Sequence, residues 1–160
     1  IIIKKFARNK KMFTILRMGN VFGFKQINNK AQVNENLIHN LCNSGLKKRK
    51  IIIKNGSVQR NFIPSQIFIK VINLIIKKDL FRNSVENIFY KNLNLKDIGF
   101  IIFNRIKFLF KLDVDIKIEK YKYQKQFKST SNKNFKFNFN MKKIYFEIDE
   151  ILKFLKKNNL

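Results

Sequence analysis

The sequence predicts an α/β fold that forms half of a doubly wound, mostly parallel sheet. Short apolar runs of strand length alternate along the chain with longer segments of helical spacing, the pattern typical of α/β proteins. The chain also opens on what reads as a helix end, residues 1–8, with no strand–helix–strand unit before it. We therefore expect a segment of such a fold, cut off just after a helix.

The first half of the chain is expected to hold three strands and one helix. The first strand is predicted at residues 13–16, a short apolar run. A helix follows and is expected to stop at Gly45. Its apolar residues at helical spacing are Val33, Leu37, Leu41 and Cys42. Two short strands come next, at residues 51–53 before the turn pair Asn55-Gly56 and at residues 62–63.

The second half alternates in the same way. A helix is predicted from the apolar stripe of Ile67, Val71, Ile72, Ile75 and Ile76. A strand is expected at residues 87–90, a helix at residues 95–110 with Asn94 as its cap, and a strand at residues 114–118. Residues 121–140 are lysine-rich without clear periodicity, which predicts a loop. A closing helix is predicted from Ile144, Ile148, Ile151, Leu152 and Leu155.

The formal net charge of +25 ordinarily suggests a polyanion partner such as nucleic acid. Two observations disfavour that interpretation. The sequence is dominated by Ile, Lys, Asn and Phe, which can be encoded without G or C, and the lysines are spread along the whole chain. A basic nucleic-acid-binding module nevertheless stays open as an alternative, because aromatic residues and lysines interleave at residues 121–139.

Single copies of cysteine and histidine limit the chemistry. One cysteine, Cys42, excludes an intramolecular disulfide, and the lone His39 excludes a histidine-pair metal motif, so we expect no metal site. Cys42 is expected in the core and His39 on a solvated helix flank. No apolar run approaches the ~20 residues of a membrane span, and the start does not resemble a signal peptide. A cytoplasmic location is the default expectation.

Three segments in order carry a resemblance to a known family. They are Leu16-Arg17-Met18-Gly19-Asn20-Val21-Phe22-Gly23, the strand pair of residues 51–64 that contains Gln59-Arg60-Asn61-Phe62-Ile63-Pro64, and the strand of residues 85–92. They resemble the "LRxxNVYG", "iyGdGsqxRDFv" and "iyNvg" segments of the extended short-chain dehydrogenase/reductase family, the NAD-dependent nucleotide-sugar epimerases and dehydratases. The register holds from Phe13 to the end of the chain.

The resemblance implies the C-terminal portion of a doubly wound Rossmann-type sheet together with the smaller substrate-binding domain. The whole chain, residues 1–160, would be a truncated domain of this family. Residues 24–64 and 111–160 would form mostly the substrate-binding part, and residues 1–23 and 65–110 mostly the remaining Rossmann strands and helices.

The resemblance also implies the roles of particular residues. Cofactor contacts are expected from Gly19, Asn20 and Val21. Contacts to a nucleotide-diphosphate sugar are expected from Asn20, Asn36, Leu37, Ile51, Ile53, Arg60 and Phe62. Arg60 is the strongest candidate, since a guanidinium forks onto phosphate oxygens. Structural alternatives stay open: a turn residue for Asn20, a helix start for Asn36-Leu37, a buried strand for the isoleucines and a surface arginine for Arg60.

Several departures from the family pattern matter. Asn61 stands where the family usually has Asp, and Ser65-Gln66 replaces the usual acidic pair. A second phosphate-binding arginine is missing after Arg105, where Lys125 or Lys128 could substitute. We find no GxxGxxG phosphate loop. One Tyr-x-x-x-Lys spacing, Tyr121 to Lys125, comes after the Arg60 strand instead of before Leu16, so we reject it as catalytic.

These observations predict the nucleotide-sugar-binding half of an epimerase, dehydratase or reductase. No catalytic residue is assigned, and we expect no turnover from this chain alone. The intact family enzyme would bind NAD or NADP and would form a homodimer. Apart from the nucleic-acid-binding module, a decayed remnant that binds nothing well is the other alternative.

Overall fold

The computed structural model describes residues 13–23, 25–27, 30–32, 36–79, 84–119 and 138–158. The helix end predicted at residues 1–8 lies outside the described residues, and so does the predicted loop apart from residues 138–140. The helices are α2 (Leu37–Lys48), α3 (Ser65–Lys77), α4 (Leu95–Phe110) and α5 (Met141–Asn158). The strands are β1 (Thr14–Met18), β2 (Asn20–Phe22), β3 (Lys25–Ile27), β4 (Lys30–Gln32), β5 (Lys50–Lys54), β6 (Gln59–Pro64), β7 (Ser84–Ile88), β8 (Lys91–Asn94) and β9 (Asp115–Glu119).

The strands form four small sheets, three of which contain a parallel pair. Parallel pairing joins β1 to β7, β2 to β6, and β5 to β9. Antiparallel pairing adds β8 to the other edge of β6 and joins β3 to β4 as a hairpin. The α/β class with parallel pairing is therefore confirmed. The antiparallel β6–β8 pair is a departure from the mostly parallel pairing that was expected.

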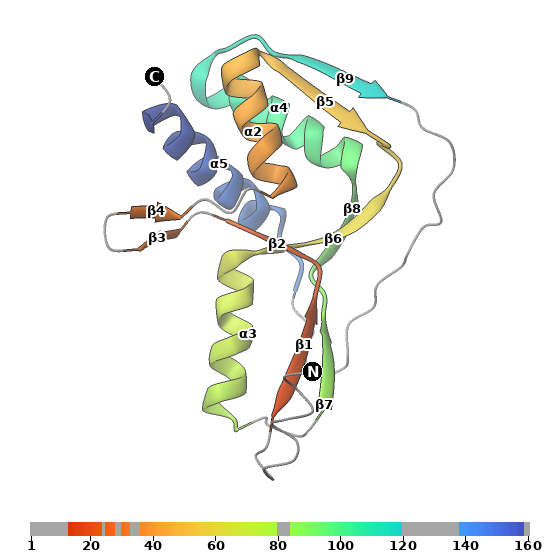
Figure 1. Cartoon of the computed structure of the whole chain (residues 1–160), viewed down its shortest axis with the longest axis vertical. Coiled ribbons are helices and arrows are strands. Elements are labelled where there is room, and N and C mark those ends of the chain that lie inside the picture. Colours follow the sequence, from red (N-terminus) through yellow and green to blue (C-terminus); the bar gives the residue numbers. More distant parts are fainter. Residues whose placement is uncertain are drawn as a thin grey trace.

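The chain crosses a central junction between two groups of elements (Figure 1). Strands β1 and β7 lie at one end with α3, whereas α2, α4, α5, β5 and β9 lie at the other. The three-stranded sheet β2–β6–β8 connects the two groups. Although α4 belongs to the predicted Rossmann part, it packs against α2, α5, β5 and β9. The division of the chain into two parts stays a prediction.

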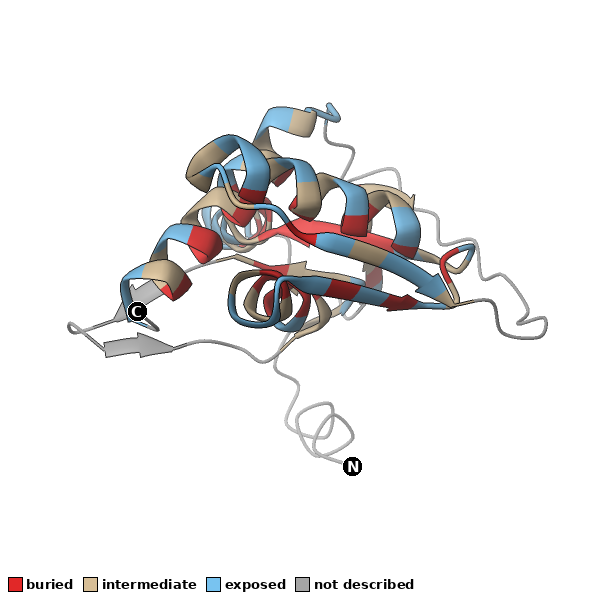
Figure 2. Cartoon of the chain, turned by 90° about the horizontal axis from the view of Figure 1, so that it is seen from above, coloured by how far each residue is buried: buried red, intermediate tan, exposed pale blue. Residues whose placement is uncertain are grey.

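The core lies where α2 and α4 pack on β5 and α5 packs on both of these helices, and Figure 2 shows buried positions on the surfaces where helices and strands face one another. Strand β5 alternates buried and exposed residues, with Ile51 and Ile53 pointing inward. The predicted stripe of α5 is buried throughout, at Ile144, Ile148, Ile151, Leu152 and Leu155. In α3 the stripe holds at Ile67, Val71 and Ile75, but Ile76 is 62% exposed.

The ends of α4 and α2 illustrate a correct and an incorrect prediction. Helix α4 begins after Asn94 as predicted, and Asn94 and Asp97 form a reciprocal capping box. The predicted stop of α2 at Gly45 is wrong, because the helix continues to Lys48 and ends at Arg49 in the left-handed region, with φ 52°. Gly45 is buried, and a Cβ there would lie 2.6 Å from Cδ1 of Ile106. This glycine serves close packing of α2 on α4.

Three other sequence predictions need correction. The strand predicted at residues 87–90 is β7, Ser84–Ile88, and the chain then pairs again as β8. His39 is buried, with 9% exposed, and does not lie on a solvated flank. Strands β2, β3 and β4 were not expected.

None of the helices in the described part of the chain has both the length and the hydrophobicity that a membrane span requires.

Candidate functional site

The first and second motifs meet where β2 runs beside β6. Asn20 pairs with Phe62 in the parallel register. Just before β2, the backbone of Gly19 touches Asn61, and a Cβ on Gly19 would lie 2.6 Å from both Cβ and the carbonyl oxygen of Asn61. This contact explains why residue 19 is a glycine, because any side chain there would push the start of β2 away from β6.

Asn20 uses one of its amide hydrogens inside the protein. Its Nδ2 donates to the carbonyl oxygen of Asn61 across 3.2 Å, which fastens the start of β2 to β6. The amide oxygen of Asn20 accepts no hydrogen bond within the described part of the chain, and the residue is only half-buried. Asn20 therefore keeps an acceptor and a second N–H for a ligand.

Asn61, which stands in place of the usual Asp, is 6% exposed. Its Oδ1 lies 3.5 Å from the backbone nitrogen of Tyr90, which donates to it. Its Nδ2 is buried without an acceptor among the described residues. A neutral amide suits this position, since a buried carboxylate would need more donors than the one shown here.

The start of α2 is fastened to the end of β2. Asn36 caps the helix, because its Oδ1 accepts from the backbone nitrogen of His39 at 3.0 Å. Its Nδ2 reaches the carbonyl oxygen of Val21 at 3.4 Å. The first N–H groups of α2, beginning at Leu37, therefore lie close to the motif that contains Asn20. The amino end of a helix carries a partial positive charge that favours anions.

Arg60 and Phe62 both lie on β6 but meet different surroundings. Arg60 is exposed, and no carboxylate within the described residues forms an ion pair with it. Phe62 is fully buried and packs edge-to-face on Phe22, with ring centroids 6.3 Å apart. The arginine is thus available to a ligand, whereas the phenylalanine ring supports the junction from inside.

Ile51 and Ile53 occupy a different sheet from the other candidates. Both side chains are buried on β5, which pairs with β9 and not with β6. Gly45 and Gly99 allow α2 and α4 to approach these two isoleucines closely. Any contribution to ligand binding would come from the β5 backbone. The structure therefore groups Gly19, Asn20, Val21, Asn36, Leu37, Arg60 and Phe62 along the β2–β6 pair and separates the isoleucines from them.

Sequence reasoning did not single out Glu147 of α5. This carboxylate is 2% exposed, and its Oε1 accepts from Ser65 Oγ at 2.7 Å and from the backbone nitrogen of Gln66 at 3.1 Å. Ser65-Gln66 lacks the expected acidic pair, and here the carboxylate reaches the start of α3 from a distant helix. A signal was present, because Glu147 falls between Ile144 and Ile151 on the buried stripe of α5.

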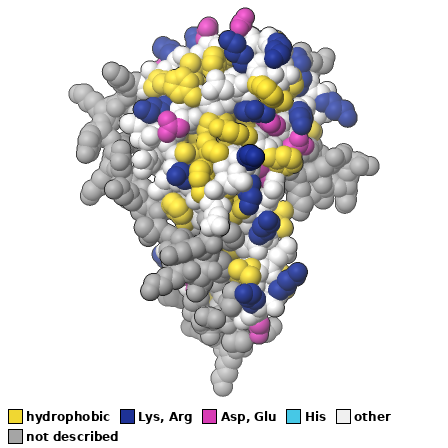
Figure 3. Space-filling model, turned by 180° about the vertical axis from the view of Figure 1, so that it is seen from behind, with side chains coloured by type: hydrophobic (Ala, Val, Ile, Leu, Met, Phe, Trp, Pro, Cys, Tyr) yellow, Lys and Arg dark blue, Asp and Glu magenta, His cyan; other side chains and the backbone are white. Residues whose placement is uncertain are grey.

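On the face drawn in Figure 3, lysines and arginines are spread between exposed apolar side chains and form no single stripe.

Cys42 is confirmed in the core, where burial raises the pKa of its thiol well above the usual range and the Asp149 carboxylate adds to the effect. A thiol held neutral in this way is a poor nucleophile.

Comparison of the sequence with family profiles and with curated proteins gives no match. The structure, in contrast, matches solved α/β enzymes. It is similar to a UDP-N-acetylglucosamine 4-epimerase from Methanobrevibacter ruminantium, with 22% identity and a TM-score of 0.68, over 98% of this chain and 50% of that one. It is also similar to dTDP-glucose 4,6-dehydratase from Bacillus anthracis, with 15% identity and a TM-score of 0.69, over 98% and 49%.

An epimerase from Methanothermobacter thermautotrophicus matches with 12% identity and a TM-score of 0.73, over 98% of this chain and 49% of that one. The chain thus spans about half the length of these relatives in structure. Its fold is similar to about half of each of these epimerase and dehydratase chains. That this half is the C-terminal one stays a prediction of the sequence motifs.

Proposed function

We propose that this chain binds a nucleotide-diphosphate sugar along the β2–β6 pair, as the nucleotide-sugar-binding half of an NAD(P)-dependent epimerase, dehydratase or reductase. One observation carries the proposal. Asn36 ties the positive end of α2 to Val21, next to the half-buried Asn20, while the exposed Arg60 lies on the neighbouring strand. A helix end, an amide and a guanidinium together suit a diphosphate.

Each group has a distinct task in this proposal. Arg60 supplies a fork of donors to phosphate oxygens, and the first N–H groups of α2 add neutral donors aligned with the helix dipole. Asn20 offers its remaining amide N–H to the diphosphate, while its bond to Asn61 keeps the amide oriented. Phosphate binding at a distance from the reacting carbon positions the sugar, which is how binding energy assists catalysis.

The cofactor belongs to the proposal for the intact enzyme. The sequence holds no GxxGxxG loop, and the contact between Gly19 and Asn61 accounts for this glycine without a cofactor. The residues of this chain therefore do not make an NAD or NADP site by themselves, and Gly19, Asn20 and Val21 would line only its edge. The resemblance further implies a homodimer, a cytoplasmic location and a setting in surface polysaccharide synthesis.

Isothermal titration of the 160-residue chain with UDP-N-acetylglucosamine and with dTDP-glucose tests the proposal. We expect saturable binding of at least one of them and none of free N-acetylglucosamine, since the diphosphate supplies most contacts. A parallel titration with single-stranded DNA at several salt concentrations tests the alternative. Tight DNA binding with a steep salt dependence and no nucleotide-sugar binding would replace our proposal with a nucleic-acid-binding module.

A further inference from the structure

Glu147 connects three segments that are far apart in the sequence. It lies on α5, and its carboxylate accepts hydrogen bonds from Ser65 Oγ and from the backbone nitrogen of Gln66. It also lies against Gly23, where a Cβ would come within 2.5 Å of Oε2 of Glu147. Gly23 has φ +153°, and a Cβ on it would also come too close to Ser65. The residue directly after β2, the start of α3 and the carboxylate of Glu147 are therefore in close contact.

The carboxylate takes the place of a local helix cap. Helix α3 begins after Pro64, which has no side chain that can cap it. A carboxylate at the amino end of a helix satisfies unpaired N–H groups and favours the helix dipole. Burial of this charge is costly unless it is hydrogen-bonded, and the donors of Ser65 and Gln66 help to offset that cost.

The position of Glu147 matters because the two segments that it contacts directly follow the two strands of the candidate site. Ser65 directly follows β6, the strand of Arg60, and Gly23 directly follows β2, the strand of Asn20. One carboxylate is thus hydrogen-bonded just past the end of β6 and lies against the residue just past the end of β2. Tyr90 anchors the start of α5 on the same junction, since its Oη donates to the carbonyl oxygen of Asn140 at 3.0 Å and its backbone nitrogen donates to Asn61.

We propose that Glu147 is a positioning residue for the nucleotide-sugar site, which it orders by fixing the ends of β2 and β6 relative to each other. This inference rests on the proposed function for its effect on affinity, but the ordering itself can be measured without a ligand. Glu147 contacts Ser65 and the backbone of Gln66, so its effect on the ligand is transmitted through β2 and β6.

The test compares Glu147→Ala with Asp149→Ala in the full 160-residue chain. Asp149 lies two residues away on the same helix and pairs with Arg105 on α4, so its loss also weakens α5 packing but leaves the β2–β6 ends untouched. We expect Glu147→Ala to lower the affinity for UDP-N-acetylglucosamine about tenfold and Asp149→Ala about twofold or less, at matched folded fractions. Glu147→Gln, which keeps an acceptor oxygen, should recover most of the affinity.

Hydrogen exchange of the ligand-free protein gives the second readout. Exchange at Gln66 and along β2 should accelerate in Glu147→Ala and not in Asp149→Ala. Equal loss of affinity in both variants, or unchanged exchange along β2 in Glu147→Ala, overturns the inference. If the parent chain binds no nucleotide sugar, the proposed function fails and the exchange data alone decide on Glu147. Should Glu147→Ala not fold, Ser65→Ala removes the hydrogen bond from Ser65 Oγ to Glu147, and unchanged exchange along β2 in that variant likewise overturns the inference.

Discussion

Gly19 and Asn61 are in van der Waals contact without room for a side chain on the glycine. A Cβ on Gly19 would lie 2.6 Å from the Asn61 carbonyl oxygen, which already accepts the hydrogen bond of Asn20. The backbone of Asn61 cannot move away without breaking the β2–β6 pairing. Contacts within the protein therefore exclude a side chain at residue 19. Four predictions follow from this contact and others.

Gly19→Ala should destabilise the fold. The added methyl group forces β2 away from β6, with an expected loss of roughly 1–3 kcal/mol in the free energy of unfolding. Urea denaturation measures the loss. Gly45→Ala is the comparison variant, because the atoms nearest to its Cβ would be side-chain atoms, Cδ1 of Ile106 at 2.6 Å and Cγ1 of Ile51 at 3.3 Å, and alanine is favoured in a helix interior. An equal or larger loss in Gly45→Ala would contradict this explanation.

Arg60→Ala should weaken nucleotide-sugar binding with little effect on folding. Loss of a charge-assisted bidentate contact is expected to cost roughly 1.5–3 kcal/mol, or about one to two decades in affinity. Arg60→Lys should recover only part, since an ammonium group cannot reproduce the fork. Titration calorimetry with UDP-N-acetylglucosamine measures both variants. Lys107→Ala on α4 removes the same charge elsewhere and should bind as the parent does.

If Arg60→Ala binds the nucleotide sugar as tightly as the parent, the assignment of Arg60 to the diphosphate is wrong. A loss of stability with unchanged affinity would instead identify a surface arginine with a structural role. Thermal unfolding of the same samples distinguishes these outcomes.

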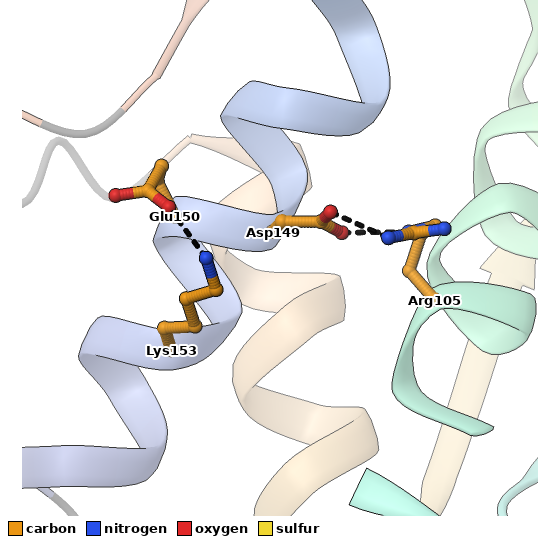
Figure 4. A network of polar contacts seen from close by, with 4 residues as sticks. All are labelled: Arg105, Asp149, Glu150 and Lys153. Atoms are coloured by element: carbon orange, nitrogen blue, oxygen red, sulfur yellow. Dashed lines mark hydrogen bonds and ion pairs between the residues drawn. The ribbon is translucent and has the colours of Figure 1, made fainter. Parts of the chain in front are cut away.

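Arg105→Ala should lower stability through the loss of the ion pair between α4 and α5 (Figure 4). The guanidinium of Arg105 donates to both carboxylate oxygens of Asp149, at 2.7 and 2.5 Å, and both side chains are mostly buried. We expect a loss of about 2 kcal/mol, because Asp149 would keep its charge without this partner. Lys153→Ala breaks the exposed pair with Glu150 and should leave the denaturation midpoint unchanged.

Cys42 should resist alkylation in the folded protein and react only on unfolding. Burial raises the pKa of its thiol, so the folded state keeps the proton where the unfolded chain loses it. The free energy of unfolding is then independent of the Cys42 thiol below about pH 8.5. Above that pH it falls by up to ~1.4 kcal/mol per pH unit. Denaturation at pH 8 and 9.5 measures the slope, which Cys42→Ala should reduce. Rapid labelling of the native thiol would count against it.

Local signals predicted several elements well. The bounds of α4 follow from the apolar run at residues 95–110 and from Asn94, whose side chain acts within one helical turn. Strand β5 follows from consecutive isoleucines, and the stripe of α5 is buried as expected. In each of these cases the deciding interactions are close in sequence or the apolar pattern is long.

The errors arose where distant residues decide the structure. Gly45 looks like a helix stop, but its contact with Ile106 on α4 gives it a packing role. His39 was placed on a solvated flank because it is polar, and the fold nevertheless buries it. Strands β2 and β8 hold three and four residues and exist because they pair with β6. The site shows the same limit, since the partner of Ser65 is Glu147, brought close only by the fold.

The pairing of β1 with β7 has a consequence for synthesis on the ribosome. Thr14 of β1 pairs with Ser84, so β1 is synthesised about seventy residues before this partner strand. At roughly 5–20 residues per second, the nascent chain carries an unpaired apolar strand for roughly 4–14 s. Such distant pairing also slows folding after release. Chaperone demand in the cell should therefore concentrate on the interval between translation of β1 and of β7.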